Sequence, residues 1–472
     1  MSATLRISGL LALFALGCNG PGSKVGRGGT GGAGPADTGG SSGGSNTGGS
    51  TGGSKGTGGS IETGGSPGTG GAQGGEGGRD AAAADAAQDA RAGAEAPVAS
   101  GSFPKVDTFD VEACHDLDIA VGHTVVGVAT NPGVANFYGK DGKLAYKTQP
   151  FPGAAVGDAH ISWDESSKRF FFSTLQAKGG DAAWISVSTD ETGKSWTPPA
   201  KVMGPTSLDN PQLVVTSDKV ALLVFDCVFT MDKSAVLEAN GQPIPSVKNC
   251  GIKHTDQTYA VDYGPTVPAT AYFAVMSDDA HFNWISVEGT PKAGNVKLTQ
   301  HMVALSKPFT RIPAFPGVTA FGGMVTRNSG NMAEWNAGHL WWSQSGKCGA
   351  DVCPRMFEVN TETGVARDFD FALPGFTLWS CAPGLDKDGN MFALMAQTNS
   401  TTPVSLAVGG MTAAGGMIKP QTVWKGTGDF PAPQFGDFFD AAQDPVDGTV
   451  WAVGNYAANG KCGARVVHVA AQ

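Results

Sequence analysis

Three aspartates open similar apolar segments of this chain, and a histidine follows one of them closely. Asp158 and His160 lie in GDAHISWDESSKRFFFSTL, Asp437 lies in GDFFDAAQDPVDGTVWAVGN, and Asp209 opens DNPQLVVTSDKVALLVFD. Carboxylates that converge from such segments can serve as the acid and base of glycoside cleavage, or can bind a cation. The alternative that we favour is structural, because an aspartate at such a position can also bond the backbone of a neighbouring segment.

The segments that carry these residues belong to a repeated pattern of short strands. Apolar runs such as PQLVVTS, KVALLVFD and TVWAVGN are separated by turn residues, and helical periodicity is scarce. The segments from residues 157 and 209 begin about 50 residues apart, which is close to one four-stranded blade. The pattern predicts an all-β domain over residues 101–472, a β-propeller of six or seven blades whose first strands line a central channel.

One turn in this domain resembles a motif of a known superfamily. The stretch SVSTDETGKSWTPP places Ser188, Asp190, Gly193, Ser195 and Trp196 in an order similar to the Asp box of the sialidase (BNR-repeat) superfamily, with one extra residue before the glycine. In that superfamily the box lies on an outer hairpin turn of a blade, remote from the active site. The aspartate can bond turn amides and the glycine can adopt positive φ, so the resemblance implies an architectural role.

The same resemblance implies an arginine that binds a substrate carboxylate. Arg311 in FTRIPAF is the candidate, because Arg-Ile-Pro is the core of the superfamily's Phe-Arg-Ile-Pro motif. Here a threonine separates Phe309 from Arg311, and the segment falls in the middle of the domain, whereas the superfamily's copy begins it. Chance occurrence is the favoured alternative.

Tryptophans offer a second kind of binding surface. Trp341, Trp342 and Trp379 are candidates for stacking on sugar rings, with packing between blades as the favoured alternative. The stretch LDKDGN at 385–390 has the alternating Asp and Asn of a calcium loop. Met391 and Gln397 stand where an EF-hand loop has Gly and Glu, so we predict a hairpin turn there and no metal site.

The N-terminus indicates export. Residues 1–17 combine one arginine with an apolar run too short to span a bilayer, as in a secretory signal peptide. ALGC at 15–18 resembles the lipobox of bacterial lipoproteins, in which the cysteine, here Cys18, is acylated. Residues 18–100 are dominated by Gly, Ser and Ala and are expected to form a disordered tether. The alternative is an ordinary secreted protein.

The other seven of the eight cysteines are expected to form disulfides, with one left over. The favoured pairs are Cys348 with Cys353 across a short loop and Cys227 with Cys250 across an insertion. A zinc site is the competing possibility, but no Cys-x-x-Cys pair or cluster of histidines supports it. One cysteine among Cys114, Cys381 and Cys462 is therefore expected to stay free or to pair between chains.

The charge balance limits the class of partner. With 42 acidic and 32 basic residues the net charge is −10, which should repel nucleic acid and anionic lipid headgroups. No cofactor motif stands out. We expect a lipid-anchored protein of the bacterial envelope, at the outer membrane or cell surface, whose propeller binds a carbohydrate or protein ligand. The alternatives are a glycoside hydrolase or polysaccharide lyase that uses channel carboxylates, and a structural module without a small ligand.

Overall fold

The computed structural model describes most of the chain after residue 104. The described residues are 105–112, 114, 116–131, 133–152, 156–176, 182–203, 211–224, 226–253, 258–310, 333–349, 351–428 and 439–470. All of them belong to one of the two compact units into which the chain divides, Asp80–Gln472. The predicted signal peptide and tether lie outside these residues.

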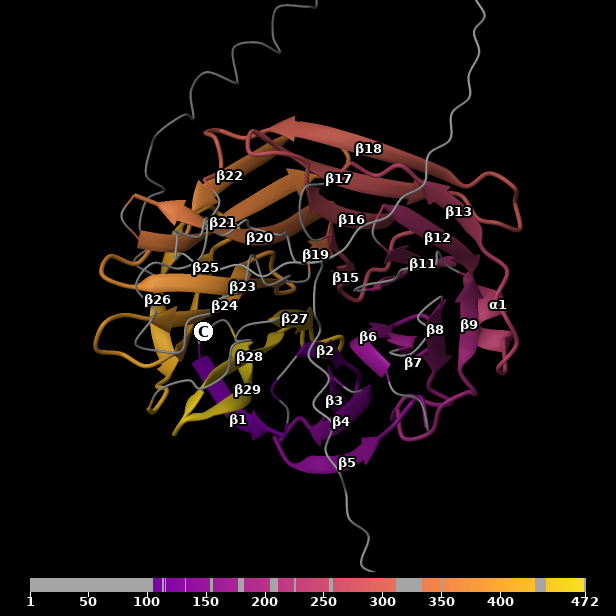
Figure 1. Cartoon of the computed structure of the whole chain (residues 1–472), viewed down its shortest axis with the longest axis horizontal. Helices are drawn as coiled ribbons and strands as arrows, with labels where there is room; N and C mark the ends of the chain where they lie inside the picture. The colour runs from indigo at the N-terminus through magenta and orange to yellow at the C-terminus, as the bar shows by residue number, and fades with distance from the viewer. Residues whose placement is uncertain are drawn as a thin grey trace, which may run out of the picture. The chain divides into compact units, whose positions relative to one another are not determined.

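Seven mostly antiparallel sheets are arranged around one axis, so the domain is a seven-bladed β-propeller (Figure 1). This confirms the predicted all-β class. Blades 1 to 3 follow the chain in order. Blade 1 consists of β2 (Asp118–Val121), β3 (Val125–Thr130), β4 (Val134–Gly139) and β5 (Leu144–Thr148), and blade 2 of β6 (Val156–Asp164), β7 (Arg169–Gln176), β8 (Ala182–Val187) and β9 (Ala200–Met203). Blade 3 consists of β10 (Gln212–Val215), β11 (Lys219–Val224), β12 (Cys227–Asp232) and β13 (Val247–Cys250).

Blades 4 to 7 complete the ring. Blade 4 consists of β14 (Thr258–Tyr259), β16 (Ala271–Met276), β17 (His281–Glu288) and β18 (Lys297–Ala304), and blade 5 of β15 (Val261–Tyr263), β19 (Ala333–Asn336), β20 (His339–Cys348), β21 (Asp351–Asn360) and β22 (Ala366–Asp370). Blade 6 consists of β23 (Thr377–Leu385), β24 (Met391–Thr398), β25 (Ser405–Met411) and β26 (Met417–Trp424). Blade 7 consists of β27 (Asp440–Gln443), β28 (Val450–Ala458), β29 (Lys461–Ala470) and β1 (Lys105–Val111).

Blade 7 joins the two ends of the domain. Its outer strand, β1, comes from the beginning of the described chain and pairs antiparallel with β29 along its whole length. A disulfide between Cys114 and Cys462 links the chain just after β1 to the start of β29. The ring is therefore closed both by a backbone ladder and by a covalent bond.

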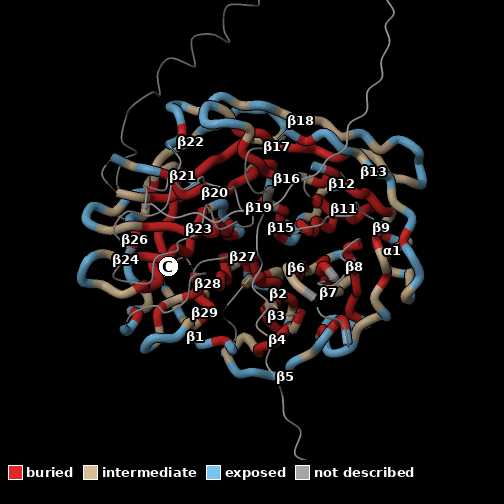
Figure 2. Tube along the Cα trace, viewed as in Figure 1, coloured by how far each residue is buried: buried red, intermediate tan, exposed pale blue. Residues whose placement is uncertain are grey.

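The hydrophobic core is divided among the blade interfaces. Seven clusters of buried side chains each combine residues of two adjacent blades. Consecutive residues such as Phe170, Phe171 and Phe172 on β7 are all fully buried, because both faces of the blade are covered by its neighbours. Figure 2 shows this burial along the inner and middle strands, with exposed residues along the outer rim.

Two features depart from a regular propeller. The short helix α1 (Lys233–Glu238) follows β12 within the insertion of blade 3. β14 pairs with β16 in the sheet of blade 4. β15, which one residue separates from β14, pairs instead in parallel with β19 of blade 5. Among the described residues no helix has the length and apolar composition that crossing a bilayer requires.

Candidate functional site

Four of the residues singled out from the sequence lie outside the described residues. These are Cys18, Asp209, Arg311 and Asp437. The structure describes the remaining candidates, which are Asp158, His160 and Trp379. They occupy three different environments.

Asp158 lies in a β-bulge of β6, where the register with β7 shifts between Gly157 and His160. Its φ is +50°, and two other polar residues, Asp116 just before β2 and Ser380 within β23, have φ values of +50° and +49°. Short polar side chains tolerate this left-handed conformation better than most others. The repeated geometry gives Asp158 a conformational role in the bulge.

His160 belongs to a hydrogen-bond chain that crosses four inner segments. The N–H of Ala260 donates to Oε1 of Gln212 at 2.6 Å, so the amide nitrogen of Gln212 is the group that faces Nε2 of His160, at 3.3 Å. The other ring nitrogen, Nδ1, lies 2.5 Å from Oδ2 of Asp118. This network places the ring proton on Nδ1, where it is donated to the carboxylate.

Asp440, in blade 7, forms a hydrogen bond to blade 1, at the interface where the ring closes. Its Oδ2 accepts a 2.8 Å hydrogen bond from the N–H of Ile119 in blade 1, and its Oδ1 accepts one from the N–H of Ala441. An aspartate that bonds the backbone of the neighbouring blade is the arrangement favoured from the sequence. The residue that makes this bond is three positions after the expected Asp437.

Two more acids come from the innermost strands of blade 5. Asp262 on β15 and Glu334 on β19 are register partners in the parallel pair. The Asp262 carboxyl accepts a 3.3 Å hydrogen bond from the hydroxyl of Ser162 in blade 2. Because β15 turns away from blade 4, it brings this carboxyl into contact with residues of blade 2 across the axis.

We call Asp118, His160, Asp262, Glu334 and Asp440 the channel cluster. Their exposed fractions are 2%, 4%, 6%, 0% and 0%, so the cluster is almost completely sealed from solvent. Among the described residues no lysine or arginine forms an ion pair with any of its four carboxyls. Both carboxyl oxygens of Glu334 and one oxygen each of Asp118 and Asp262 have no hydrogen-bond partner.

Burial and mutual repulsion raise the pKa values of several of these acids. Burial raises the pKa of Asp262, and the nearby Asp118 carboxylate raises it further. Burial and the Asp262 charge raise the pKa of Glu334 in the same direction. The pKa of Asp440 is also raised, first by burial and then by the charges of Asp118 and Asp262. Chemically, the cluster can hold protons or exchange them for a cation.

The sequence contained a signal for part of this cluster. In blades 2 and 7 the channel residue stands four positions before the aspartate of the following turn, as in HISWD for His160 and DAAQD for Asp440. Alignment on the Gly-Asp pairs selected Asp158 and Asp437 instead. Asp118, Asp262 and Glu334 have no such local mark, and sequence reasoning missed them.

The turn aspartates themselves have a structural role. Asp164, Asp386 and Asp444 follow the inner strands of blades 2, 6 and 7 and accept hydrogen bonds from amides of their turns. Lys233 and Lys140, each from the blade that follows, pair with Asp164 and Asp444 at 2.7 Å. Residues 385–390 form the hairpin turn between β23 and β24 that the sequence predicts.

Trp379 is fully buried in the core cluster between blades 6 and 7. Trp341 and Trp342 are also buried, between blades 5 and 6 and between blades 4 and 5. A ring without exposed surface cannot stack on a sugar. The candidate binding role of Trp379 is therefore corrected to packing between blades, the alternative that the sequence favoured.

The turn from Ser188 to Trp196 joins the third and fourth strands of blade 2. Asp190 accepts the N–H of Thr192 at 2.9 Å, and the Ser188 hydroxyl donates to the carbonyl of Asp190 at 2.7 Å. Gly193 has a φ of +73°, and Trp196 contacts the rings of Phe137 in blade 1 and Phe172 in blade 2. The turn thus fastens two blades on their outer side.

Three disulfides are present in the described part of the chain. Cys227–Cys250 and Cys348–Cys353 are the two pairs expected from the sequence, and Cys114–Cys462 is the third. Cys381 is a buried thiol whose pKa burial raises to about 12.

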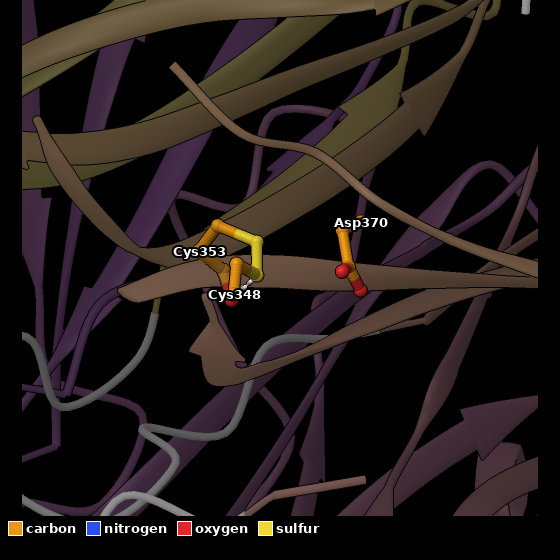
Figure 3. Close-up of side chains that lie close together, drawn as sticks. All are labelled: Cys348, Cys353 and Asp370. Atoms are coloured by element: carbon orange, nitrogen blue, oxygen red, sulfur yellow. Dashed lines mark hydrogen bonds between the residues drawn. A yellow bond between two sulfur atoms is a disulfide. The ribbon is translucent and has the colours of Figure 1, made fainter. Parts of the chain in front are cut away.

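A set of three metal-type donors lies outside the channel. Figure 3 shows Asp370 beside the disulfide of Cys348 and Cys353, with all three donor atoms within 4.8 Å of one another. The two sulfurs are bonded to each other and so offer no thiolate to zinc. Asp370 pairs instead with Lys307 at 2.5 Å.

Comparison with known proteins identifies no family. No protein-family model matches the chain, and no curated protein matches its sequence. Among solved structures, BamB from Moraxella catarrhalis matches with a TM-score of 0.39 and 11% identity, over 78% of this chain and 100% of that chain. The WD40 domain of Toxoplasma gondii coronin matches with a TM-score of 0.38 and 12% identity, over 80% and 89%. The propeller fold is established by the chain's own seven sheets.

Proposed function

We propose that this protein is an exported, lipid-anchored envelope protein whose propeller binds a carbohydrate or protein ligand. The observation that carries the choice of binding over catalysis is the burial of the channel cluster. Its four carboxyls are at most 6% exposed. A general acid must reach the proton it transfers, directly or through one water, and a polysaccharide cannot enter a sealed cluster.

Two features support export and anchoring. The described part of the chain contains three disulfides, which persist in oxidising compartments. Cys18 follows an apolar run and precedes a long Gly/Ser-rich segment, as in a lipoprotein that carries its domain on a tether. The geometry of the turn from Ser188 to Trp196 supports an affiliation with the sialidase-type propellers, which remains part of the proposal.

The anchor is tested by the substitution Cys18→Ser. Acyl chains contribute about 0.8 kcal/mol per buried methylene, so their loss should release the protein from membranes. The measurement is the fraction that sediments with membranes after a carbonate wash, with Cys381→Ser as the control that leaves Cys18 intact. A Cys18→Ser protein that still sediments would show that lipidation is not the anchor.

Binding is distinguished from catalysis with the soluble Cys18→Ser protein. We expect no turnover of fluorogenic glycosides or acidic polysaccharides, and specific retention on a glycan array or by a purified envelope protein. Asp209→Asn and Asp437→Asn provide the decisive comparison, because these acids are the sequence candidates outside the described residues. Turnover that either substitution abolishes without a change in melting temperature would establish the enzyme alternative.

A further inference from the structure

We propose that the channel cluster is a binding site for one divalent cation of the calcium type. Asp118, Asp262, Glu334 and Asp440 supply carboxyl oxygens from four strands, β2, β15, β19 and β27. Calcium binds six to eight oxygens, mostly from carboxylates, carbonyls and water. Cation binding was a possibility for Asp158, Asp209 and Asp437 from the sequence, but nothing singled out these four residues, which lie far apart along the chain.

The state of Glu334 indicates that the channel cluster is a ligand site and does not only hold the blades together. The two carboxyl oxygens of Asp440 are held by the amides of Ile119 and Ala441, which accounts for that side chain as a brace between blades. Glu334 is equally buried, but neither of its oxygens has a hydrogen-bond partner. Such a group costs stability unless something binds it. Asp262 is its register partner in the parallel pair, and the Asp262 charge raises the pKa of Glu334.

The channel cluster also differs from the buried acids of the inner turns in how its charge is balanced. Elsewhere in this chain a buried acid on an inner turn is paired with a lysine of the next blade, as Asp164 is with Lys233. No lysine or arginine among the described residues pairs with the four channel carboxyls. A divalent ion would supply the missing charge.

The donor set selects the kind of ion. His160 already uses Nδ1 toward Asp118 and Nε2 toward Gln212, so the cluster offers oxygen ligands and no imidazole. Oxygen ligands suit calcium better than zinc. The channel carboxyls are not among the described donors that lie within 4.8 Å of one another in threes. Binding one ion therefore requires the carboxyl groups to move closer together, and neither oxygen of Glu334 is held in place by a hydrogen bond.

The experiment measures calcium bound to the full-length Cys18→Ser protein after treatment with chelator. Equilibrium dialysis with radioactive calcium should find one ion per chain, and the melting temperature should rise with free calcium. Both effects should be stronger at pH 8 than at pH 6, because protons compete for the same oxygens. Magnesium should produce a smaller shift.

Matched variants locate the ion. Glu334→Gln keeps the shape of the side chain and should abolish stoichiometric binding, whereas Asp388→Asn on the exposed turn at 385–390 should leave it unchanged. Absence of bound calcium in the unsubstituted channel at millimolar concentration would overturn the proposal. Binding that Glu334→Gln retains, or that Asp388→Asn removes, would overturn it as well.

A second variant keeps the test decisive if Glu334→Gln does not fold. Asp262 is the register partner of Glu334, so Asp262→Asn should also abolish stoichiometric calcium binding. Unchanged binding in that variant would refute the channel site.

Discussion

The backbone N–H of Ile119, in the first blade, donates a 2.8 Å hydrogen bond to Oδ2 of Asp440, in the last. The two residues are 321 positions apart in the chain. This bond crosses the interface at which the ring closes, next to the ladder between β1 and β29 and the disulfide of Cys114 and Cys462. The stability of the propeller should therefore depend on a few contacts at this interface.

Asp440→Ala should destabilise the protein more than Asp440→Asn. The asparagine keeps an oxygen that can accept the Ile119 N–H, whereas the alanine leaves that buried donor unpaired at a cost of about 1–3 kcal/mol. Urea unfolding followed by fluorescence measures the difference, and the comparison cancels the removal of the charge, which both variants share. Equal stabilities would show that the bond contributes nothing to closure.

The ring-closing disulfide should matter more than the hairpin disulfide. Cys114 and Cys462 are separated by 348 positions and Cys348 and Cys353 by five. Loop-closure entropy then gives roughly 6 kcal/mol for the first bond and roughly 2 kcal/mol for the second. Paired Cys→Ser variants of each disulfide, compared by chemical unfolding, provide the measurement. A larger loss from the hairpin pair would contradict the closure argument.

Gly193→Ala should be more costly than Gly364→Ala. Both glycines have positive φ, +73° and +72°, so both substitutions strain the backbone by about 1–2 kcal/mol. A Cβ on Gly193 would also lie 2.4 Å from the ring of Phe137, whereas Gly364 has nothing within 4 Å. We expect about 1–3 kcal/mol of additional loss at Gly193 from overpacking. Thermal unfolding of both variants tests the packing role of the turn.

The stability of the calcium-free protein should fall as pH rises above the ordinary carboxyl pKa of about 4. The pKa values of Asp262, Glu334 and Asp440 are raised in the folded chain, so these groups stay protonated there after the unfolded chain has lost its protons, above about pH 4. Each such group lowers the free energy of unfolding by about 1.4 kcal/mol per pH unit until pH passes its folded pKa.

Two histidines have the opposite effect on stability below pH 6.5. The pKa values of His301 and His468 are lowered from 6.5 by burial, so their contribution to stability increases with pH and is complete above 6.5. Glu334→Gln removes one titrating carboxyl and should make the decline of stability with pH shallower than in the unsubstituted protein, which has the same two histidines. An unchanged slope in that variant would mean that Glu334 is ionised in the folded protein.

The thiol of Cys381 should resist alkylation in the native protein. It is fully buried beside the sulfur of Met356, and burial raises its pKa to about 12, so almost no thiolate exists at pH 8. Iodoacetamide under non-reducing conditions should label it only after unfolding, and mass mapping should find the other six domain cysteines in disulfides. Rapid labelling of the native protein would contradict this burial.

The sequence alone determined the features that depend on neighbouring residues. Strand-turn repetition predicted the propeller, and the local spacing of Cys348 and Cys353 predicted their disulfide. The pattern around Asp386 predicted a hairpin turn. The individual strands, the turn and the disulfide each depend on hydrogen bonds or a covalent bond within one hairpin, where the chemistry of a few residues is sufficient.

The tertiary structure decided which acids meet in the channel. The Gly-Asp pairs in the sequence predicted Asp158 as a channel residue, but the β-bulge around it places His160 at the channel position instead. Asp262 enters the channel because β15 leaves blade 4 and joins β19 in parallel, a crossing that no local pattern marks. Ring closure brings Asp440 to Ile119. Such contacts depend on the number of blades and the path of the chain between them, so their partners are fixed only when all seven sheets have packed.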